Sequence, residues 1–270
     1  MSLAAPATPA SYRFRDGALV RAEQDESHVP IEVADSFLVR DGCALGFDLH
    51  LARFGAGVER GSLGPPPDLD GFWRAVARVI PSEGDWFPRV EWAPGPRGPE
   101  LLLRLRAAPE RSVSVVLASH DGADPRTRPL VKGPDLTSMG LVRAAARARG
   151  AGEAVILSPE GYVVEGAYSA VLWWRGDSLC SPSADLERVD SVTARIVVTI
   201  AAALGIEVVQ ESTTPDELDG LEIWAVSALH GIRIVTGWVG GPQPAERPGR
   251  LQLWRDRLGK LSRPLGTVEE

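Results

Sequence analysis

The sequence contains very little lysine. Only two of its 29 basic residues, Lys132 and Lys260, are lysines, and the other 27 are arginines. The two residue types are nearly equivalent as solubilising charge, but only lysine has a primary amine that can lose its proton and attack a carbonyl. Lys260 lies in WRDRLGKL, where it fits the end of a helix. Lys132 lies in PLVKGPDL, before an expected helix, and its role could be a surface charge, an ion pair or chemistry.

Cysteine, excess positive charge and long apolar runs are also scarce. Cys43 and Cys180 fit neither a disulfide framework nor a CxxC metal site, so no metal site is expected. A net charge of −7 without a basic block argues against a nucleic-acid partner. The run IVVTIAAALGI is too short to span a bilayer, and MSLAAPATPASYRFRDG at the N-terminus lacks the apolar core of a signal peptide. We therefore expect a soluble, cytoplasmic protein without a membrane partner.

Apolar periodicity divides the chain into a strand-rich first part and a second part in which helices and strands alternate. Its 270 residues are enough for one or two domains. Helices are expected at 48–59, 71–80, 135–150, from 190 or 191 onward, and 247–260, with Asp135 as a cap. The polar stretch SHDGADPRTRP is the best domain boundary. The pattern predicts an α/β (α+β) fold with domains over 1–120 and 130–270 and a linker over 121–129.

A carboxylate and a glycine interrupt the apolar segment YVVEGAYSAVLWW, which is expected to be one strand over 162–174. Glu165 is either a charge at a strand edge or a buried group with a fixed cationic partner, because unpaired burial of a charge is costly. Gly166 indicates the close approach of another group. On its own this segment does not decide between the two interpretations of Glu165.

Three further features could bind an anion such as a phosphate group. A helix is expected to begin at Ser191, and the N–H groups and hydroxyl of Val192 and Thr193 could hold an anion or simply cap the helix. In VSALHGIR, the small residues before Gly231 can form a turn whose N–H groups face an anion. Arg53 in HLARF lies next to the apolar side of its helix. An amine, a carboxylate and several phosphate donors describe a site for pyridoxal 5′-phosphate (PLP); scattered structural roles are the alternative.

Residues 132–174 resemble the core of the class IV aminotransferases, the fold type IV PLP enzymes. This family includes branched-chain aminotransferases, D-amino acid aminotransferases and aminodeoxychorismate lyases. Its pattern of lysine, helix, Gly, Glu-Ala and Glu-Gly-x-x-Ser-Asn is matched here by Lys132, Gly150, Glu153-Ala154 and Glu165-Gly166-Ala167-Tyr168-Ser169-Ala170. HLARF, DSVTARIVV and VSALHGIR resemble the family's phosphate-binding elements. The resemblance covers most of the chain, and it implies a two-domain, D-amino acid aminotransferase-like fold and a homodimer.

The resemblance also implies roles for individual residues. Lys132 would hold PLP as a Schiff base and act as the general acid and base, while Glu165 would support the pyridinium nitrogen. The phosphate group would be bound by Arg53, Val192, Thr193, Ser227, Ala228 and Leu229. Tyr168, His230 and Arg233 are candidates for substrate contacts. Tyr168 could instead be a packing residue, His230 a loop histidine and Arg233 a strand residue that faces solvent. The 33-residue gap from Lys132 to Glu165 and the turn SPEGYVVE are most similar to the lyase branch.

The implied activity is that of a 4-amino-4-deoxychorismate lyase, which forms 4-aminobenzoate and pyruvate, as in folate biosynthesis. One alternative is an aminotransferase acting on branched-chain or D-amino acids, and another is a degenerate family member without catalytic activity. Two departures concern the substrate pocket. The family's Tyr-Gly-Asp-Gly-x-Phe stretch is absent, with PIEVADSFLVRDG in its place, and the last Asn of Glu-Gly-x-x-Ser-Asn is Ala170.

Overall fold

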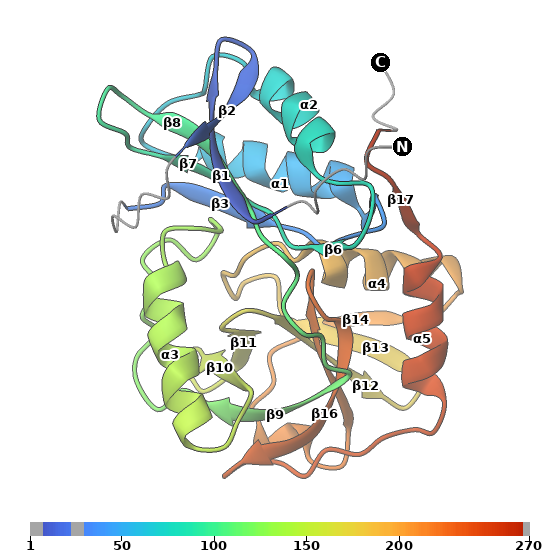
Figure 1. Ribbon diagram of the computed structural model, residues 1–270. Coiled ribbons are helices and arrows are strands. Elements are labelled where there is room, and N and C mark those ends of the chain that lie inside the picture. Colours follow the sequence, from blue (N-terminus) through green and yellow to red (C-terminus); the bar gives the residue numbers. More distant parts are fainter. Residues whose placement is uncertain (1–7, 23–29, 267–270) are drawn as a thin grey trace. The chain divides into compact units, whose positions relative to one another are not determined.

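The computed structural model describes residues 8–22 and 30–266 (Figure 1). Residues 1–7, which begin the N-terminal stretch considered above, lie outside the described residues. The chain forms two compact units. Unit 1 comprises the described residues of Met1–Glu110, Lys132–Pro134 and Ser262–Glu270, and unit 2 comprises Arg111–Val131 and Asp135–Leu261.

Unit 1 contains a five-stranded antiparallel sheet in the order β2-β1-β8-β7-β3. Its strands are β1 (Ala10–Arg15), β2 (Ala18–Ala22), β3 (Val33–Ser36), β7 (Arg89–Ala93) and β8 (Glu100–Leu105). Helices α1 (Phe47–Glu59) and α2 (Leu69–Val79) contact β3 and β2, respectively (Figure 1). A second sheet, β17-β5-β4-β6, consists of β4 (Val39–Arg40), β5 (Cys43–Leu45), β6 (Asp85–Trp86) and β17 (Ser262–Pro264).

Aromatic rings form much of the core of unit 1. Trp73 of α2 meets Phe47 and Phe54 of α1 edge-on, with centroid distances of 5.6 Å. Phe37, which follows β3, meets Phe47 at 5.1 Å. Edge-to-face pairs of this kind add about 0.5 to 1.5 kcal/mol each beyond their burial. They fix α1, the helix that contains HLARF, relative to β3.

Unit 2 contains an eight-stranded mixed sheet in the order β11-β10-β9-β16-β15-β12-β13-β14. The strands are β9 (Ser114–Ser119), β10 (Glu153–Leu157), β11 (Val163–Gly166), β12 (Ala170–Arg175), β13 (Ser178–Pro182), β14 (Val208–Glu211), β15 (Glu222–Ser227) and β16 (Gly231–Val239). The helices are α3 (Leu136–Ala148), α4 (Val192–Ala203) and α5 (Arg250–Gly259), with a 3-10 turn, η1 (Asp216–Leu218). Helices α3, α4 and α5 contact β10, β15 and β16, respectively (Figure 1).

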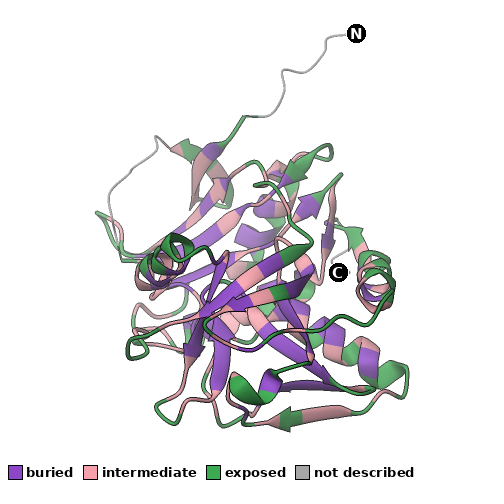
Figure 2. Cartoon of the chain, turned by 90° about the horizontal axis from the view of Figure 1, so that it is seen from below, coloured by how far each residue is buried: buried purple, intermediate pink, exposed green. Residues whose placement is uncertain are grey.

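Figure 2 shows buried residues along the strands of both units, whereas loops and the outward faces of helices are exposed. In unit 2 one core cluster includes Val171, Trp173 and Val235, and a second joins Met139 of α3 to Ile156 of β10. All five helices expected from the sequence form, with ends close to those expected. No helix within the described part of the chain has the length and apolar character needed to cross a membrane.

The prediction of one strand over 162–174 is wrong, because a tight turn separates β11 from β12. Gly166 N donates a hydrogen bond of 2.7 Å to Ser169 O across this turn. A Cβ at Gly166 would lie 2.4 Å from Ser169 Oγ, so only glycine fits. The close approach indicated by Gly166 is therefore that of Ser169, from the same turn.

Asp135 does not cap α3 with its side chain, contrary to the expectation. Its Oδ1 accepts hydrogen bonds from N and Oγ1 of Thr127, at 3.0 and 2.8 Å, and its Oδ2 accepts one from Arg128 N at 3.0 Å. Asp135 therefore fastens the polar segment between β9 and α3. At the other end of α3, Gly150 has φ 87° and ends the helix as expected.

Candidate functional site

Lys132 lies against β3 within unit 1. Its carbonyl oxygen accepts a hydrogen bond of 2.7 Å from Ala34 N. The next residue, Gly133, has φ 136°, and a Cβ at this position would lie 2.5 Å from Ala34 N. Only glycine lets the chain run this close to β3. The contact fixes the backbone from which the half-buried Lys132 side chain extends.

Asp35 of β3 is a fully buried carboxylate that binds two side chains of α1. Arg53 donates from Nε to Oδ2 at 2.8 Å and from Nη2 to Oδ1 at 2.7 Å. His50 Nδ1 donates to Oδ1 at 2.8 Å. His50 and Arg53 are three residues apart, so they lie on one face of α1. The two-pronged contact with Asp35 fixes the plane of the Arg53 guanidinium.

The charges of this cluster favour an ionised Asp35 and a neutral His50. Burial alone would raise the pKa of Asp35, but Arg53 and His50 hold that pKa well below its usual range. Burial lowers the pKa of His50, and the charges of Arg53 and Lys132 add to this effect against that of Asp35. Unit 1 thus brings together two of the predicted residues, Lys132 and Arg53, with Asp35 and His50, which were not predicted.

Glu165 of β11, in unit 2, is buried and ion-paired. Its Oε1 accepts a hydrogen bond of 2.5 Å from Nη1 of Arg126, and the two side chains are only 9% and 5% exposed. The other edge of Arg126 donates from Nε and Nη2 to the carboxylate of Asp124 at 2.6 to 3.1 Å. Of the two roles left open by the sequence, Glu165 therefore has that of a buried group with a fixed cationic partner.

A second guanidinium, that of Arg188, acts electrostatically on Glu165. Three carbonyl oxygens hold it: Nη1 donates to Ser183 O at 2.6 Å and to Leu186 O at 2.8 Å, and Nη2 donates to Pro182 O at 2.7 Å. Burial lowers the pKa of Arg188, and the negative charge of Glu165 opposes this. Glu165 therefore experiences positive charge from two separate segments of unit 2.

Helix α4 begins at Val192, as the phosphate-site prediction requires. Ser191 Oγ accepts a hydrogen bond of 3.3 Å from Ala194 N, so Ser191 is the N-cap. The side chains of Val192 and Thr193 in the first turn are buried. The predicted anion-binding role of these two residues stays a prediction.

Ser227, Ala228 and Leu229 end β15 and form the turn into β16. His230 N donates to Ser227 Oγ at 3.3 Å, and Arg111 Nε donates to Leu229 O at 2.9 Å. The turn is therefore held by a contact at each end. Its role as a phosphate loop, like that of the start of α4, stays a prediction.

Two of the candidate substrate residues contact Glu153, a buried carboxylate at the start of β10. Arg233 is only 2% exposed, and its Nη2 lies 3.4 Å from Glu153 Oε2, so the alternative that it faces solvent is wrong. Tyr168 N donates to Glu153 Oε1 at 3.3 Å, while its ring is exposed and lies 5.2 Å from the guanidinium of Arg143. Arg233 is therefore part of a buried ion pair within unit 2.

His230, the remaining candidate, lies in the turn between β15 and β16, and its role in substrate binding stays a prediction. Its Nδ1 accepts a hydrogen bond of 3.2 Å from Ser112 N. Burial, followed by the charges of Arg233, Arg143 and Arg111, lowers the pKa of His230 to about 4. A ring that accepts at Nδ1 and stays neutral can donate only from Nε2.

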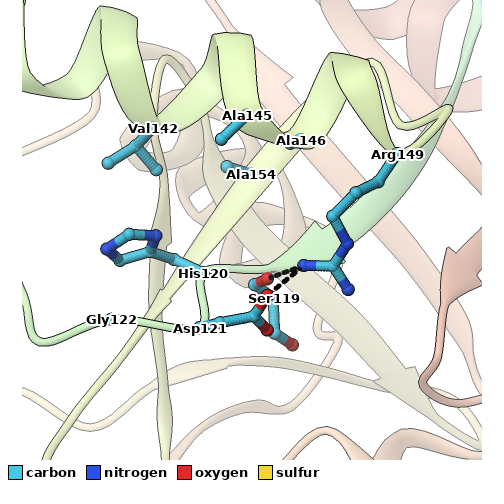
Figure 3. Close-up of a pocket in the computed structure, with 9 residues that line it drawn as sticks. All are labelled: Ser119, His120, Asp121, Gly122, Val142, Ala145, Ala146, Arg149 and Ala154. Atoms are coloured by element: carbon cyan, nitrogen blue, oxygen red, sulfur yellow. Dashed lines mark hydrogen bonds and ion pairs between the residues drawn. The ribbon is translucent and has the colours of Figure 1, made fainter.

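A pocket of about 180 Å³ lies beside α3 (Figure 3). Helix α3 supplies its apolar wall, and the loop 119–122 forms the polar side. Arg149 Nη1 ties the two together, because it donates to Ser119 O at 3.1 Å and to Asp121 Oδ2 at 2.7 Å. The lining consists of Ser119, His120, Asp121, Gly122, Val142, Ala145, Ala146, Arg149 and Ala154. None of the predicted cofactor residues is among them.

The order of these elements matches a known family. The family model for amino-transferase class IV matches residues 32–238. The chain belongs to this family. That stretch of the class IV chain includes β3, HLARF, Lys132, Glu165, α4 and the turn after β15. Comparison with curated protein sequences gave no significant match.

Solved structures resemble this class IV chain over nearly its whole length. A branched-chain aminotransferase from Thermoproteus uzoniensis has a TM-score of 0.82, with 20% identity and 97% of each chain covered. A hypothetical aminotransferase from Mycobacterium tuberculosis, solved PLP-bound and with α-ketoglutarate and PMP bound, has a TM-score of 0.77 at 20% identity. For its PLP-bound form, 94% of this chain and 98% of that chain are covered.

A protein assigned as a 4-amino-4-deoxychorismate lyase, from Legionella pneumophila, also has this fold. Its TM-score is 0.73 at 15% identity, with 84% of this chain and 91% of that chain covered. At such identities the similarities show the fold. The prediction of the fold type IV architecture is therefore confirmed.

Asp35, His50, Asp124 and Arg126 were not predicted as parts of the site. For two of them the sequence does contain an indication of this role. His50 stands three residues before Arg53 in HLARF, and Asp35 interrupts the apolar stretch IEVADSFLV much as Glu165 interrupts its own. Arg126 and Asp124 had none, because charges in the polar stretch DGADPRTRP are ordinary for a surface loop.

Proposed function

We propose that this class IV family member is a PLP-dependent enzyme, attached to its cofactor through Lys132, and that it acts as a 4-amino-4-deoxychorismate lyase. The observation that carries the cofactor assignment is the fixed position of Lys132 against β3, in the same cluster as Arg53, within a chain of this family. The lyase assignment is supported by the spacing of Lys132 and Glu165 and by the likeness to the L. pneumophila protein. It is also supported by VSALHGIR, which resembles the second phosphate loop of the lyases, where the sequence is often Asn-Ala-Leu or Asn-Ser-Leu.

The residues present fit the chemistry of the cofactor. Lys132 offers the primary amine for its aldehyde, and Glu165 offers a buried carboxylate for its ring nitrogen. The phosphate would be held by Arg53, Val192, Thr193, Ser227, Ala228 and Leu229. When bound, PLP supplies an electron-accepting ring that stabilises negative charge on a substrate carbon.

The side chains of this protein would orient the groups and move the proton. In the lyase reaction, the amine of Lys132 would take the proton from the substrate carbon that bears the amino group. The bond between the ring and the ether oxygen of the enolpyruvyl group would then break, the ring would become aromatic, and the released enolpyruvate would take up a proton to become pyruvate. Asp35 holds Arg53 in one orientation before any phosphate arrives, so little reorganisation is needed on binding. We also propose that the enzyme is cytoplasmic and that it is a homodimer. Sedimentation of the purified protein would test the oligomeric state.

Borohydride reduction of the purified protein, followed by peptide mass mapping, tests the attachment. We expect a phosphopyridoxyl adduct on Lys132 and none on Lys260, which serves as an internal control. The Lys132→Ala variant should carry no adduct. An unmodified Lys132 in protein given excess PLP would overturn the mechanism and leave a degenerate family member without catalytic activity.

The alternative activity is that of an aminotransferase for branched-chain or D-amino acids. It is favoured by the likeness to the T. uzoniensis and M. tuberculosis proteins. An aminotransferase must convert its bound PLP to the pyridoxamine form with an amino acid alone, which bleaches the visible absorption. A lyase need not do so, and should release 4-aminobenzoate and pyruvate from 4-amino-4-deoxychorismate in equal amounts.

A further inference from the structure

Arg126 lies in the polar segment between β9 and α3 and contacts Glu165, the expected partner of the cofactor's ring nitrogen. We propose that Arg126 is a positioning residue that holds the Glu165 carboxylate and shares its charge, so that the ring nitrogen binds a carboxylate already paired with a guanidinium. The inference rests on the proposed function, because it requires PLP to be bound at Glu165.

The contact between Arg126 and Glu165 is short and sheltered from water. Nη1 and Oε1 are 2.5 Å apart, and both side chains are at least nine-tenths buried. Ion pairs withdrawn from solvent are screened much less than surface pairs. The charge of Arg126 therefore acts on Glu165 with little screening by water, and the contact limits the directions in which the carboxylate can turn.

Asp124 and Arg188 change the net positive charge that acts on Glu165. Asp124 accepts from Nε and Nη2 of Arg126, so one guanidinium bridges two carboxylates. Asp124 is partly exposed, at 31%, and its charge is better screened than that of Glu165. Arg188 adds a second positive charge near Glu165, and Asp190 lies close enough to offset part of it. Two guanidinium ions, those of Arg126 and Arg188, therefore act electrostatically on the one buried carboxylate.

The direction of the effect on the cofactor follows from these charges. A carboxylate next to the ring nitrogen favours the protonated ring, whereas a positive charge close by disfavours it. Removing the charge of Arg126 should therefore raise the pH at which the ring nitrogen loses its proton. Removing the charge of Asp124 should lower this pH, because Arg126 then has one counter-charge fewer. If Arg126 were only structural, removing its charge and removing that of Asp124 would not shift the pH of ring-nitrogen deprotonation in opposite directions.

The experiment uses the full chain loaded with PLP that carries ¹⁵N in its ring, and follows the ring-nitrogen chemical shift by NMR as the pH is changed. We expect Arg126→Gln to raise the pH of deprotonation by about one unit and Asp124→Asn to lower it by less. Arg126→Lys, which keeps the charge, should stay near wild type. Arg149→Gln, which breaks the pair with exposed Asp121, is the matched control and should change nothing.

An unchanged titration in Arg126→Gln, or shifts of the same sign in Arg126→Gln and Asp124→Asn, would overturn this inference and leave the cofactor assignment intact. A wild-type protein that takes up no PLP would overturn both. If Arg126→Gln does not fold, Asp124→Asn decides alone, because its substitution is at a partly exposed side chain: a downward shift supports the inference, and no shift overturns it.

Discussion

In unit 1 a buried carboxylate, Asp35, holds the guanidinium of Arg53, whereas in unit 2 a buried guanidinium, that of Arg126, holds the carboxylate of Glu165. Arg53 and Glu165 are the residues expected to contact the cofactor, and they have opposite charge. Each is fixed by a partner with the charge of the other. A supporting residue is therefore recognised by its contact with a residue that is expected to bind the cofactor. It is acidic where that residue is basic, and basic where that residue is acidic.

The two clusters also differ in how completely they are sealed from water. Asp35 is fully buried, and its neighbour His50 is nearly so. The cluster of unit 2 ends at Asp124, which water reaches. Removing Asp35 takes a charge from a cluster that water hardly reaches, whereas water can partly replace a charge lost near Asp124. A substitution in the cluster of unit 1 should therefore lower the free energy of unfolding more than one in the cluster of unit 2.

The largest expected effect is that of Asp35→Ala. The substitution removes the fully buried carboxylate that pairs with Arg53, whose side chain is only 12% exposed, and loss of one partner of a buried ion pair costs about 3 to 5 kcal/mol. We expect the free energy of unfolding, measured by urea titration, to fall by about this amount. The control is Asp85→Ala in the same unit, where Asp85 and Arg40 are both exposed and the loss should stay below about 1 kcal/mol. Equal losses in the two variants would show that the burial of Asp35 does not strengthen its contribution to stability.

A smaller effect is expected for the pair in unit 2. A double-mutant cycle of Arg126→Gln and Glu165→Gln should give a coupling of about 1 to 3 kcal/mol in the free energy of unfolding of the cofactor-free protein. The same cycle on Arg149 and Asp121, whose side chains are 37% and 78% exposed, should give less than about 1 kcal/mol. A coupling between Arg126 and Glu165 no greater than that of the exposed pair would contradict the burial argument.

The smallest effect concerns His230, whose pKa is lowered by burial and by the charges of arginines, whereas the charge of Asp35 opposes the effect of burial on the pKa of His50. The His230 pKa of about 4 in the folded chain lies below the usual 6.5, so the unfolded chain binds a proton first as the pH falls. The contribution of neutral His230 to stability is complete above pH 6.5 and is lost as the pH drops toward 4. In urea titrations across this range, His230→Asn should lose less stability than wild type. Identical losses would show that His230 is not responsible.

Much of the candidate site could be proposed from local sequence, because its residues interrupt regular patterns. Lys132 is one of only two lysines among 29 basic residues, and Glu165 is a charged residue within an apolar segment. The helix start at Val192 follows from its capping serine. These features depend on a few neighbouring residues, which the sequence displays directly.

The supporting residues could not be predicted in the same way. Arg126 reaches Glu165 across 39 positions of sequence, and Asp35 reaches Arg53 across 18. Such pairs are set by strand order and by the path of a loop, which periodicity does not give. The expectation that Arg233 faces solvent was wrong for the same reason. Its alternation with isoleucines is typical of a half-exposed strand, but Arg233 is buried and pairs with Glu153 of another strand.

Unit 1 is assembled from three stretches of chain, and the middle one is only Lys132–Pro134. A fragment that ends at Glu110 would keep β3 but lose the lysine, and the remaining fragment would keep the lysine without the strand whose Ala34 N–H binds it. A break after Pro134 would keep β3 together with Lys132, but that fragment would carry Arg111–Val131 of unit 2 and lose Ser262–Glu270. A crossover between two relatives after Glu110 would combine Lys132 of one parent with β3 of the other. Only a parent with glycine at position 133 should then give a working hybrid, because a Cβ there would lie 2.5 Å from Ala34 N.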